Sequence, residues 1–282
     1  MQLIDVKTDL AFKKIFGSEE SKNILISFLN ALLDFRENPI VELTIVNPYQ
    51  LNLMRDKKDS VIGIKAILAN DIQVVIELQM LNQLGFGKKP ILSNITKSTQ
   101  HDNQAVIALM IADFVLLEFA GLDTLVINKF KTLDEEKNGY IEMVFVELPK
   151  FNKTEQQLSS MTDKWIYFLK NAANLKNIPE TFNNEEAIKQ AFQIANHFNR
   201  EELKIQSAHV NSMTVPKVPK TLMKVNVENQ EIKGKKKKIP KNKEEDKAAK
   251  LRLAKTMLES NSNVSFVMQV TGLDWADIKS CQ

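Results

Sequence analysis

Residues 59–80 constrain the fold of this chain more than any other stretch. They contain two runs rich in β-branched residues, 61–68 and 72–80, separated by a short turn, Ala69-Asn70-Asp71, with two polar residues. Such runs favour β-strands, and a short polar connection between them favours an antiparallel hairpin. The sequence therefore predicts a central hairpin with a three-residue turn.

Two polar side chains lie on one face of the second predicted strand. Side chains alternate between the two faces of a strand, so Glu77 and Gln79 point the same way, about 7 Å apart. An acid and an amide are costly to bury unless something binds them. Carboxylate and amide oxygens are ligands for hard divalent cations. The pattern therefore indicates a candidate metal-binding face.

Several short segments of the chain carry a resemblance to one protein family. They are DLAFKKIFG at 9–17, LISFLNALL at 25–33, ELQ at 77–79, ELPKF at 147–151, KWIYFL at 164–169 and TGL at 271–273. In this order they resemble the PD-(D/E)XK nuclease family transposases, which are related to the recombination-promoting nucleases of bacteria. The resemblance covers nearly the whole chain.

The resemblance implies a fold and a chemistry. The expected fold is α/β: a restriction-endonuclease-like core with a mixed central sheet, flanking helices and a helical C-terminal extension. The expected activity is Mg²⁺-dependent cleavage of DNA linked to recombination or transposition. By the same resemblance, Glu77 is the metal ligand and Gln79 orients water or phosphate.

The chain departs from the family at the first catalytic acid. The segment SVIGIKA at 60–66 matches a family strand that carries an aspartate where this chain has Gly63. A three-residue turn places position 63 opposite Glu77, and glycine offers no side-chain ligand. We therefore expect impaired cleavage. Glu42 on the preceding strand either faces solvent or lends a replacement carboxylate to the metal. The alternatives are a DNA- or protein-binding module that cuts nothing, and a nonfunctional copy.

Lysines near the expected site are candidate DNA contacts. The resemblance assigns this role to Lys13, Lys14, Lys65, Lys88 and Lys89. For Lys13 and Lys14 the alternative is a solvated helix face. Residues 91–104 lack the tyrosines of the family's matching helix, which is a second departure.

Composition sets broad limits on the type of protein. The chain has 282 residues and a net charge of +3, from 38 basic and 35 acidic residues. This small excess gives no overall preference for nucleic acid, although the lysine-rich run at 233–243 could bind phosphates or remain solvated. One cysteine excludes an intramolecular disulfide, and no apolar run reaches the length of a membrane span. We expect a cytoplasmic protein, and a homodimer is possible.

Periodicity and composition divide the chain into four parts. We expect a nuclease-like core at 1–151, a helical extension at 152–206, a Lys/Pro-rich linker at 207–246 and a short helical segment at 247–282. Within the core, we expect helices in 8–34 and further strands, at 39–47, 106–118, 128–132 and 140–147.

Overall fold

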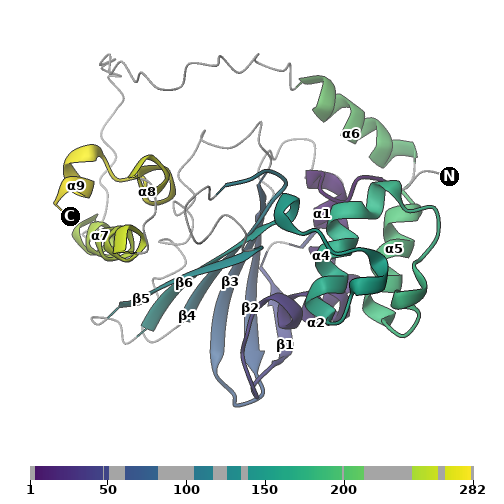
Figure 1. The fold of residues 1–282 in the computed structure, drawn as a ribbon, viewed down its shortest axis with the longest axis horizontal. Coiled ribbons are helices and arrows are strands. Elements are labelled where there is room, and N and C mark those ends of the chain that lie inside the picture. Colours follow the sequence, from purple (N-terminus) through teal and green to yellow (C-terminus); the bar gives the residue numbers. More distant parts are fainter. Residues whose placement is uncertain are drawn as a thin grey trace.

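The computed structural model shows a central β-sheet between two groups of helices (Figure 1). It describes residues 4–46, 48–50, 61–81, 105–116, 126–134, 139–198, 200–212, 243–259 and 264–280. The predicted helix at 91–104, with Lys88 and Lys89 before it, lies outside the described residues.

The sheet is mixed. Its strands are β1 (Ile40–Ile45), β2 (Val61–Leu68), β3 (Gln73–Leu81), β4 (Ala105–Ala112), β5 (Ile127–Asp134) and β6 (Gly139–Glu147). Their order across the sheet is β1-β2-β3-β4-β6-β5. β4 is parallel to β3 and β6, and the other pairs are antiparallel. The predicted α/β arrangement is confirmed.

The predicted central hairpin is also confirmed. β2 and β3 pair antiparallel, and Asp71 in the turn adopts a left-handed backbone with φ of 64°. Asp and Asn tolerate this conformation better than most residues. β4 is buried along its whole length, as its continuous apolar sequence predicts. It ends at Ala112, however, so the predicted strand at 106–118 is shorter than expected: residues 113–116 turn away from it.

One face of the sheet, called here the first face, is covered by helices that precede the first strand in the sequence and by helices that follow the last strand. They are α1 (Asp9–Phe16), α2 (Lys22–Leu32), α4 (Met161–Asn171) and α5 (Glu186–Asn196). Their buried side chains form one core with Ile62, Ile76 and Leu78 of the hairpin. Aromatic packing joins early and late parts of the chain, since the Trp165 ring lies 5.4 Å from that of Phe28.

The structure also contains five short 3₁₀ helices and the helix α6 among its described residues. The 3₁₀ helices are η1 (Glu19–Ser21), η4 (Leu148–Lys150), η5 (Glu155–Gln157), η6 (Ala172–Asn174) and η7 (Glu180–Phe182). Helix α6 spans Arg200–Ser212. No helix in the described ranges is both long enough and apolar enough to cross a membrane.

The C-terminal helices cover the other face of the sheet. They are α7 (Lys243–Glu259), α8 (Val264–Thr271) and α9 (Trp275–Lys279), and Figure 1 shows them on the side of the sheet away from α1 and α2. Met257, Val267 and Ile278 are fully buried against apolar side chains of β3 to β6. The first and last residues of the predicted linker 207–246 are helical, because α6 extends to Ser212 and α7 begins at Lys243.

A buried carboxylate ties together the ends of three strands. Glu147, the last residue of β6, is fully buried, and its oxygens accept from the backbone N–H of Leu116, 2.5 Å away, and from Asn128 Nδ2 on β5 at 3.2 Å. Lys150 Nζ lies 2.6 Å from the same carboxylate and is itself almost buried. The ELPKF segment thus contains a buried ion pair between Glu147 and Lys150, and the Glu147 carboxylate also holds the chain after β4 at Leu116.

Removing one partner of this pair should be costly. We expect Glu147→Ala to lower the free energy of unfolding by about 3–5 kcal/mol, because it leaves the Lys150 ammonium buried without its counter-charge. Urea titrations of Glu147→Ala, Lys150→Met and the double variant form a double-mutant cycle. The double variant should lose less stability than the two single losses combined. Additive losses would show that the two side chains are not coupled.

Packing of α7 against the sheet makes a second stability prediction. Met257→Ala should lower the free energy of unfolding by about 2–5 kcal/mol, because it opens a cavity under the second face. Leu203→Ala on α6, where the side chain is 46% exposed, is the control and should change stability by less than about 0.5 kcal/mol. Chemical unfolding measures both. A Met257→Ala loss as small as the control's would contradict the packing of α7.

Candidate functional site

The hairpin places Gly63 directly opposite Glu77. The paired residues of β2 and β3 are Gly63 with Glu77 and Val61 with Gln79. This is the opposition that the sequence predicts. Ile76 and Leu78 enter the first core, so Glu77 and Gln79 lie on the second face, where both are half-buried.

Small residues flank Glu77 on both neighbouring strands. Gly63 lies beside it on β2, and Ala108 lies beside it on β4. Neither neighbour projects far from the sheet. Glu77 therefore lies between one residue without a side chain and one with only a methyl group.

The backbone at Gly63 can carry a larger side chain. A Cβ built there would lie 3.5 Å from Val46 Cβ and 3.7 Å from Val46 Cγ2, which are ordinary contacts. The backbone of Gly63 is not in the left-handed region that favours glycine. Nothing in the local geometry therefore requires glycine at this position.

The structure does not bring Glu42 to Glu77. Glu42 lies beside Ile67, four residues along β2 from Gly63. At the usual rise of a strand, that separation is about 13 Å. The residue bonded to Gly63 on this side is Val46, directly after β1, whose N–H donates to the Gly63 carbonyl at 2.8 Å. Glu42 is therefore poorly placed to replace the missing acid.

The residues around Glu77 do not fit a Mg²⁺ centre held by two carboxylates. Position 63 lacks a ligand oxygen in its side chain, and Gln79 offers only a neutral amide. Within the described ranges, no cluster of three or more His, Cys, Asp or Glu side chains could hold a metal ion. One carboxylate is the low limit for Mg²⁺, which otherwise depends on water and substrate oxygens.

The predicted DNA-contacting lysines have different surroundings. Lys13 is only 9% exposed, and Lys14 Nζ lies 2.5 Å from Glu202 Oε1 of α6. Lys65 is exposed, two residues along β2 from Gly63 and on the same face. Only Lys65 is therefore both exposed and on the face of Glu77, while Lys88 and Lys89 lie outside the described residues.

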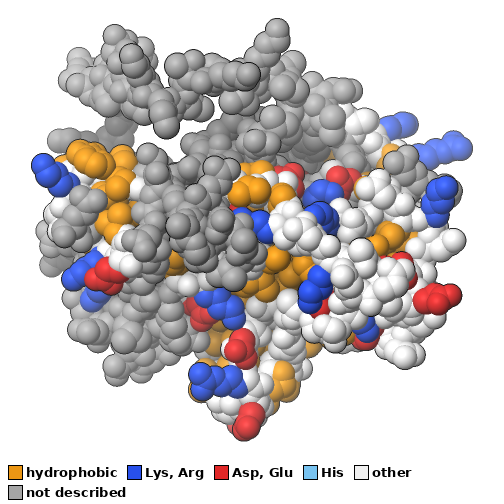
Figure 2. All heavy atoms as spheres, viewed as in Figure 1, with side chains coloured by type: hydrophobic (Ala, Val, Ile, Leu, Met, Phe, Trp, Pro, Cys, Tyr) orange, Lys and Arg blue, Asp and Glu red, His pale blue; other side chains and the backbone are white. Residues whose placement is uncertain are grey.

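Charge on the described surface is mixed. In Figure 2, Lys and Arg side chains alternate with Asp and Glu, and apolar atoms lie between them. The described part of this face carries no continuous basic patch. Any phosphate contact in these parts of the chain therefore depends on particular lysines rather than on a broad positive field.

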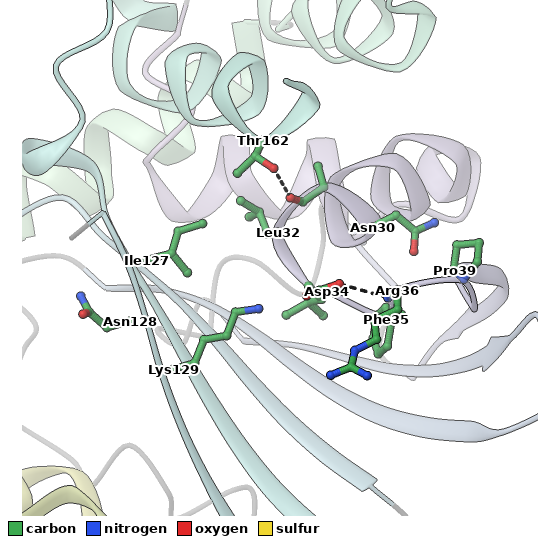
Figure 3. A pocket seen from close by; sticks show the side chains of 12 residues that line it. Asn30, Leu32, Asp34, Phe35, Arg36, Pro39, Ile127, Asn128, Lys129 and Thr162 are labelled. Carbon is green, nitrogen blue, oxygen red and sulfur yellow. Dashed lines mark hydrogen bonds between the residues drawn. The ribbon is translucent and has the colours of Figure 1, made fainter. Parts of the chain in front are cut away.

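A separate hollow of about 670 Å³ opens between the end of α2 and the start of β5. Figure 3 shows that Arg36, Asp34 and Lys129 lie at its polar side, and Asp34 Oδ1 accepts the Arg36 N–H at 3.1 Å. Thr162 at the start of α4 donates to the Ala31 carbonyl. Lys129 lies on the first face of β5, opposite Val144, so this hollow is distinct from the Glu77 face.

A second hollow of about 560 Å³ adjoins the first and contains Asp163. Lys153 Nζ lies 2.7 Å from the Asp163 carboxylate, which also accepts from the N–H and hydroxyl of Ser159. Burial alone would raise the pKa of Asp163, but the hydrogen bonds from Lys153 and Ser159 outweigh it and hold the pKa below its ordinary value. Asp163 is therefore a structural anion at the start of α4.

Sequence reasoning missed two polar clusters. Glu147 lies within the ELPKF segment, but no role could be inferred for it because two of its three partners, Leu116 and Asn128, come from distant parts of the chain. The Lys14–Glu202 pair spans 188 residues. The sequence contained no signal for the distant contacts of either cluster; the three-residue spacing of Glu147 and Lys150 within the motif was the one local signal.

Comparison with known proteins identifies one family. The family described as PD-(D/E)XK nuclease family transposase matches residues 6–213. Comparison with curated proteins and with solved structures gives no match. The match ends at the close of α6, so the helices α7 to α9 that cover the second face lie beyond it.

Acid titration tests the role of Asp163. The pKa of Asp163 in the folded protein lies below its value of about 3.9 in the unfolded chain. Ionised Asp163 therefore stabilises the fold fully when the pH is above the unfolded pKa. This stabilisation is lost as the pH falls through the folded pKa. Asp163→Asn should therefore lower the free energy of unfolding at pH 7, and the difference should shrink towards pH 2.5. Urea unfolding across this range measures it, with exposed Glu20→Gln as the control. A difference independent of pH would contradict this role.

Proposed function

The chain belongs to the PD-(D/E)XK nuclease family transposases, and we propose that it is a member that binds DNA but cleaves it poorly because of Gly63. Membership supports a nuclease or transposase function in general, and DNA is the substrate that this family suggests. The mixed sheet with its flanking helices is consistent with the restriction-endonuclease-like α/β fold.

The observation that carries the proposal is the register of the hairpin. In the family resemblance, the first acid belongs at position 63 and the second at Glu77. The two positions are directly paired across β2 and β3. This pairing supports the proposal that the chain keeps the backbone frame of the site and lacks one of its two carboxylates.

The remaining residues support binding more than hydrolysis. Glu77 is the one carboxylate of the pair, and Gln79, next to it on the same face, can orient a water or a phosphate oxygen through its amide. Lys65 can attract a phosphate from the exposed part of β2. Nucleases of this family generally use a divalent metal, but no metal-dependent step follows for a site with one carboxylate.

The second candidate is a module that binds DNA or protein and cuts nothing. The lack of a cluster of metal ligands in the described ranges favours it. Homodimer formation and a cytoplasmic location belong to the proposal in either form, whereas a preference for Mg²⁺ belongs only to the form that cleaves DNA. The two candidates differ in one respect, which is whether the scaffold cleaves DNA once the missing carboxylate is supplied.

Nicking of supercoiled plasmid with Mg²⁺ or Mn²⁺ separates these candidates. The unmodified chain should leave the plasmid almost intact, and Gly63→Asp should raise nicking about 100-fold or more, because metal-borne charge stabilisation is worth several kcal/mol. Gly63→Asn is the matched control: it adds similar bulk without the charge and should stay near background. Adding Glu77→Ala to Gly63→Asp should abolish the gain.

Other outcomes assign the function differently. Nicking by the unmodified chain that Glu77→Ala removes would mean that another acid completes the site, which contradicts the impairment. Silence of every variant, with each one folded by circular dichroism, would favour the module that binds without cutting.

A further inference from the structure

Helix α6 inserts a carboxylate into a cluster of hydrogen-bond donors contributed by the N-terminal part of the chain. Glu202 Oε1 lies 2.5 Å from Lys14 Nζ of α1 and accepts from the Tyr49 hydroxyl at 3.2 Å. The Glu202 side chain is only 4% exposed. Burial and the negative charge of Glu202 raise the pKa of Tyr49, so its hydroxyl stays protonated and donates. The ammonium and the hydroxyl thus converge on one anionic oxygen.

This cluster lies at the end of the hairpin that carries Gly63. The Tyr49 N–H donates to the Gly17 carbonyl at 2.6 Å, which fixes Tyr49 to the end of α1. A Cβ built at Gly17 would lie 3.4 Å from Ile62 Cδ1, and Ile62 is the neighbour of Gly63 on β2. Ile62 points into the first core, so the cluster lies near the beginning of β2 but on the opposite face from Gly63 and Glu77. A nucleic-acid strand that contacts Lys14 and Tyr49 as well as the Glu77 face must therefore pass around the beginning of β2.

Few of the α6 side chains that the structure describes are buried. Among the α6 side chains that the structure describes, Glu202 and Ile205 are buried, whereas Glu201, Leu203 and Lys204 are exposed. Figure 1 shows α6 at the margin of the molecule. A helix with few buried apolar contacts opens at low free-energy cost. Among the described side chains of α6, Glu202 and Ile205 are therefore the ones that attach the helix.

We infer that Glu202 occupies a phosphate-binding position, so that α6 competes with DNA for Lys14 and Tyr49. Carboxylate and phosphate oxygens accept the same charge-assisted hydrogen bonds from lysine and from hydroxyl donors. A DNA phosphate that displaces Glu202 gains both donors, while Glu202 returns to water with α6. This inference rests on the proposed function in one respect, because it takes DNA as the partner.

Binding of a fluorescein-labelled 20-base-pair DNA duplex, followed by anisotropy over a range of salt concentrations, tests the inference. Glu202→Gln keeps the size and hydrogen-bonding capacity of the side chain but removes the competing charge. It should tighten binding about tenfold, the usual effect of one charge-assisted hydrogen bond. The slope of log K against log salt should steepen by about 0.9, the value for one additional phosphate contact.

Two further variants separate competition from general charge. Glu201→Gln, on the exposed side of α6, makes the same change in net charge and should leave affinity and slope nearly as they are. Adding Lys14→Met to Glu202→Gln should abolish the gain. Near-ultraviolet circular dichroism checks that each variant is folded.

The outcomes distinguish this inference from the proposed function. Equal binding by Glu202→Gln and Glu201→Gln would overturn the inference, leave DNA as the partner and reduce Glu202 to a structural tie. A gain that persists without Lys14 would overturn it too. Failure of every folded variant to bind DNA would overturn the proposed partner and the inference together.

Discussion

The register of the β2–β3 hairpin is the constraint on which the rest of the structure depends. Asp71 accepts a left-handed backbone in the turn, and the paired strands then align Gly63 with Glu77. Because side chains alternate, a slip of one residue would turn Glu77 into the first core and expose Ile76. β3 then pairs with β4, and β4 pairs with β6, so the hairpin is joined to the rest of the sheet through β3. The pairing of β2 with β3 therefore determines both which side chains enter the first core and which lie at the candidate site.

Features that depend on local pattern could be predicted from the sequence. The hairpin, the fully buried β4 and the opposition of Gly63 and Glu77 follow from alternation, apolar runs and the length of a turn. Each involves residues that are close along the chain or that form one regular element. The departure at Gly63 could also be predicted, since it needs only the family motif and the printed residue.

Features that depend on partners far apart in the sequence could not be predicted from it. Lys14 could be interpreted as solvated or as a DNA contact, because nothing near it in the sequence indicates that Glu202 is its partner. The C-terminal helices could be expected as helices, but not as the cover of the second face, since their apolar residues pair with β4 to β6 only in three dimensions. For the same reason, Glu42 could be considered a replacement ligand until the register of β1 placed it beside Ile67.

The late position of the covering helices in the chain has a consequence for synthesis. The last strand ends at Glu147, whereas α7 begins at Lys243. At a translation rate of about 5–20 residues per second, roughly 95 residues separate these points, a delay of about 5–20 s. During that interval the nascent chain can close its first core while the apolar side chains of β4 to β6 still face water. Such a nascent chain is a natural client for chaperones that hold exposed apolar surface.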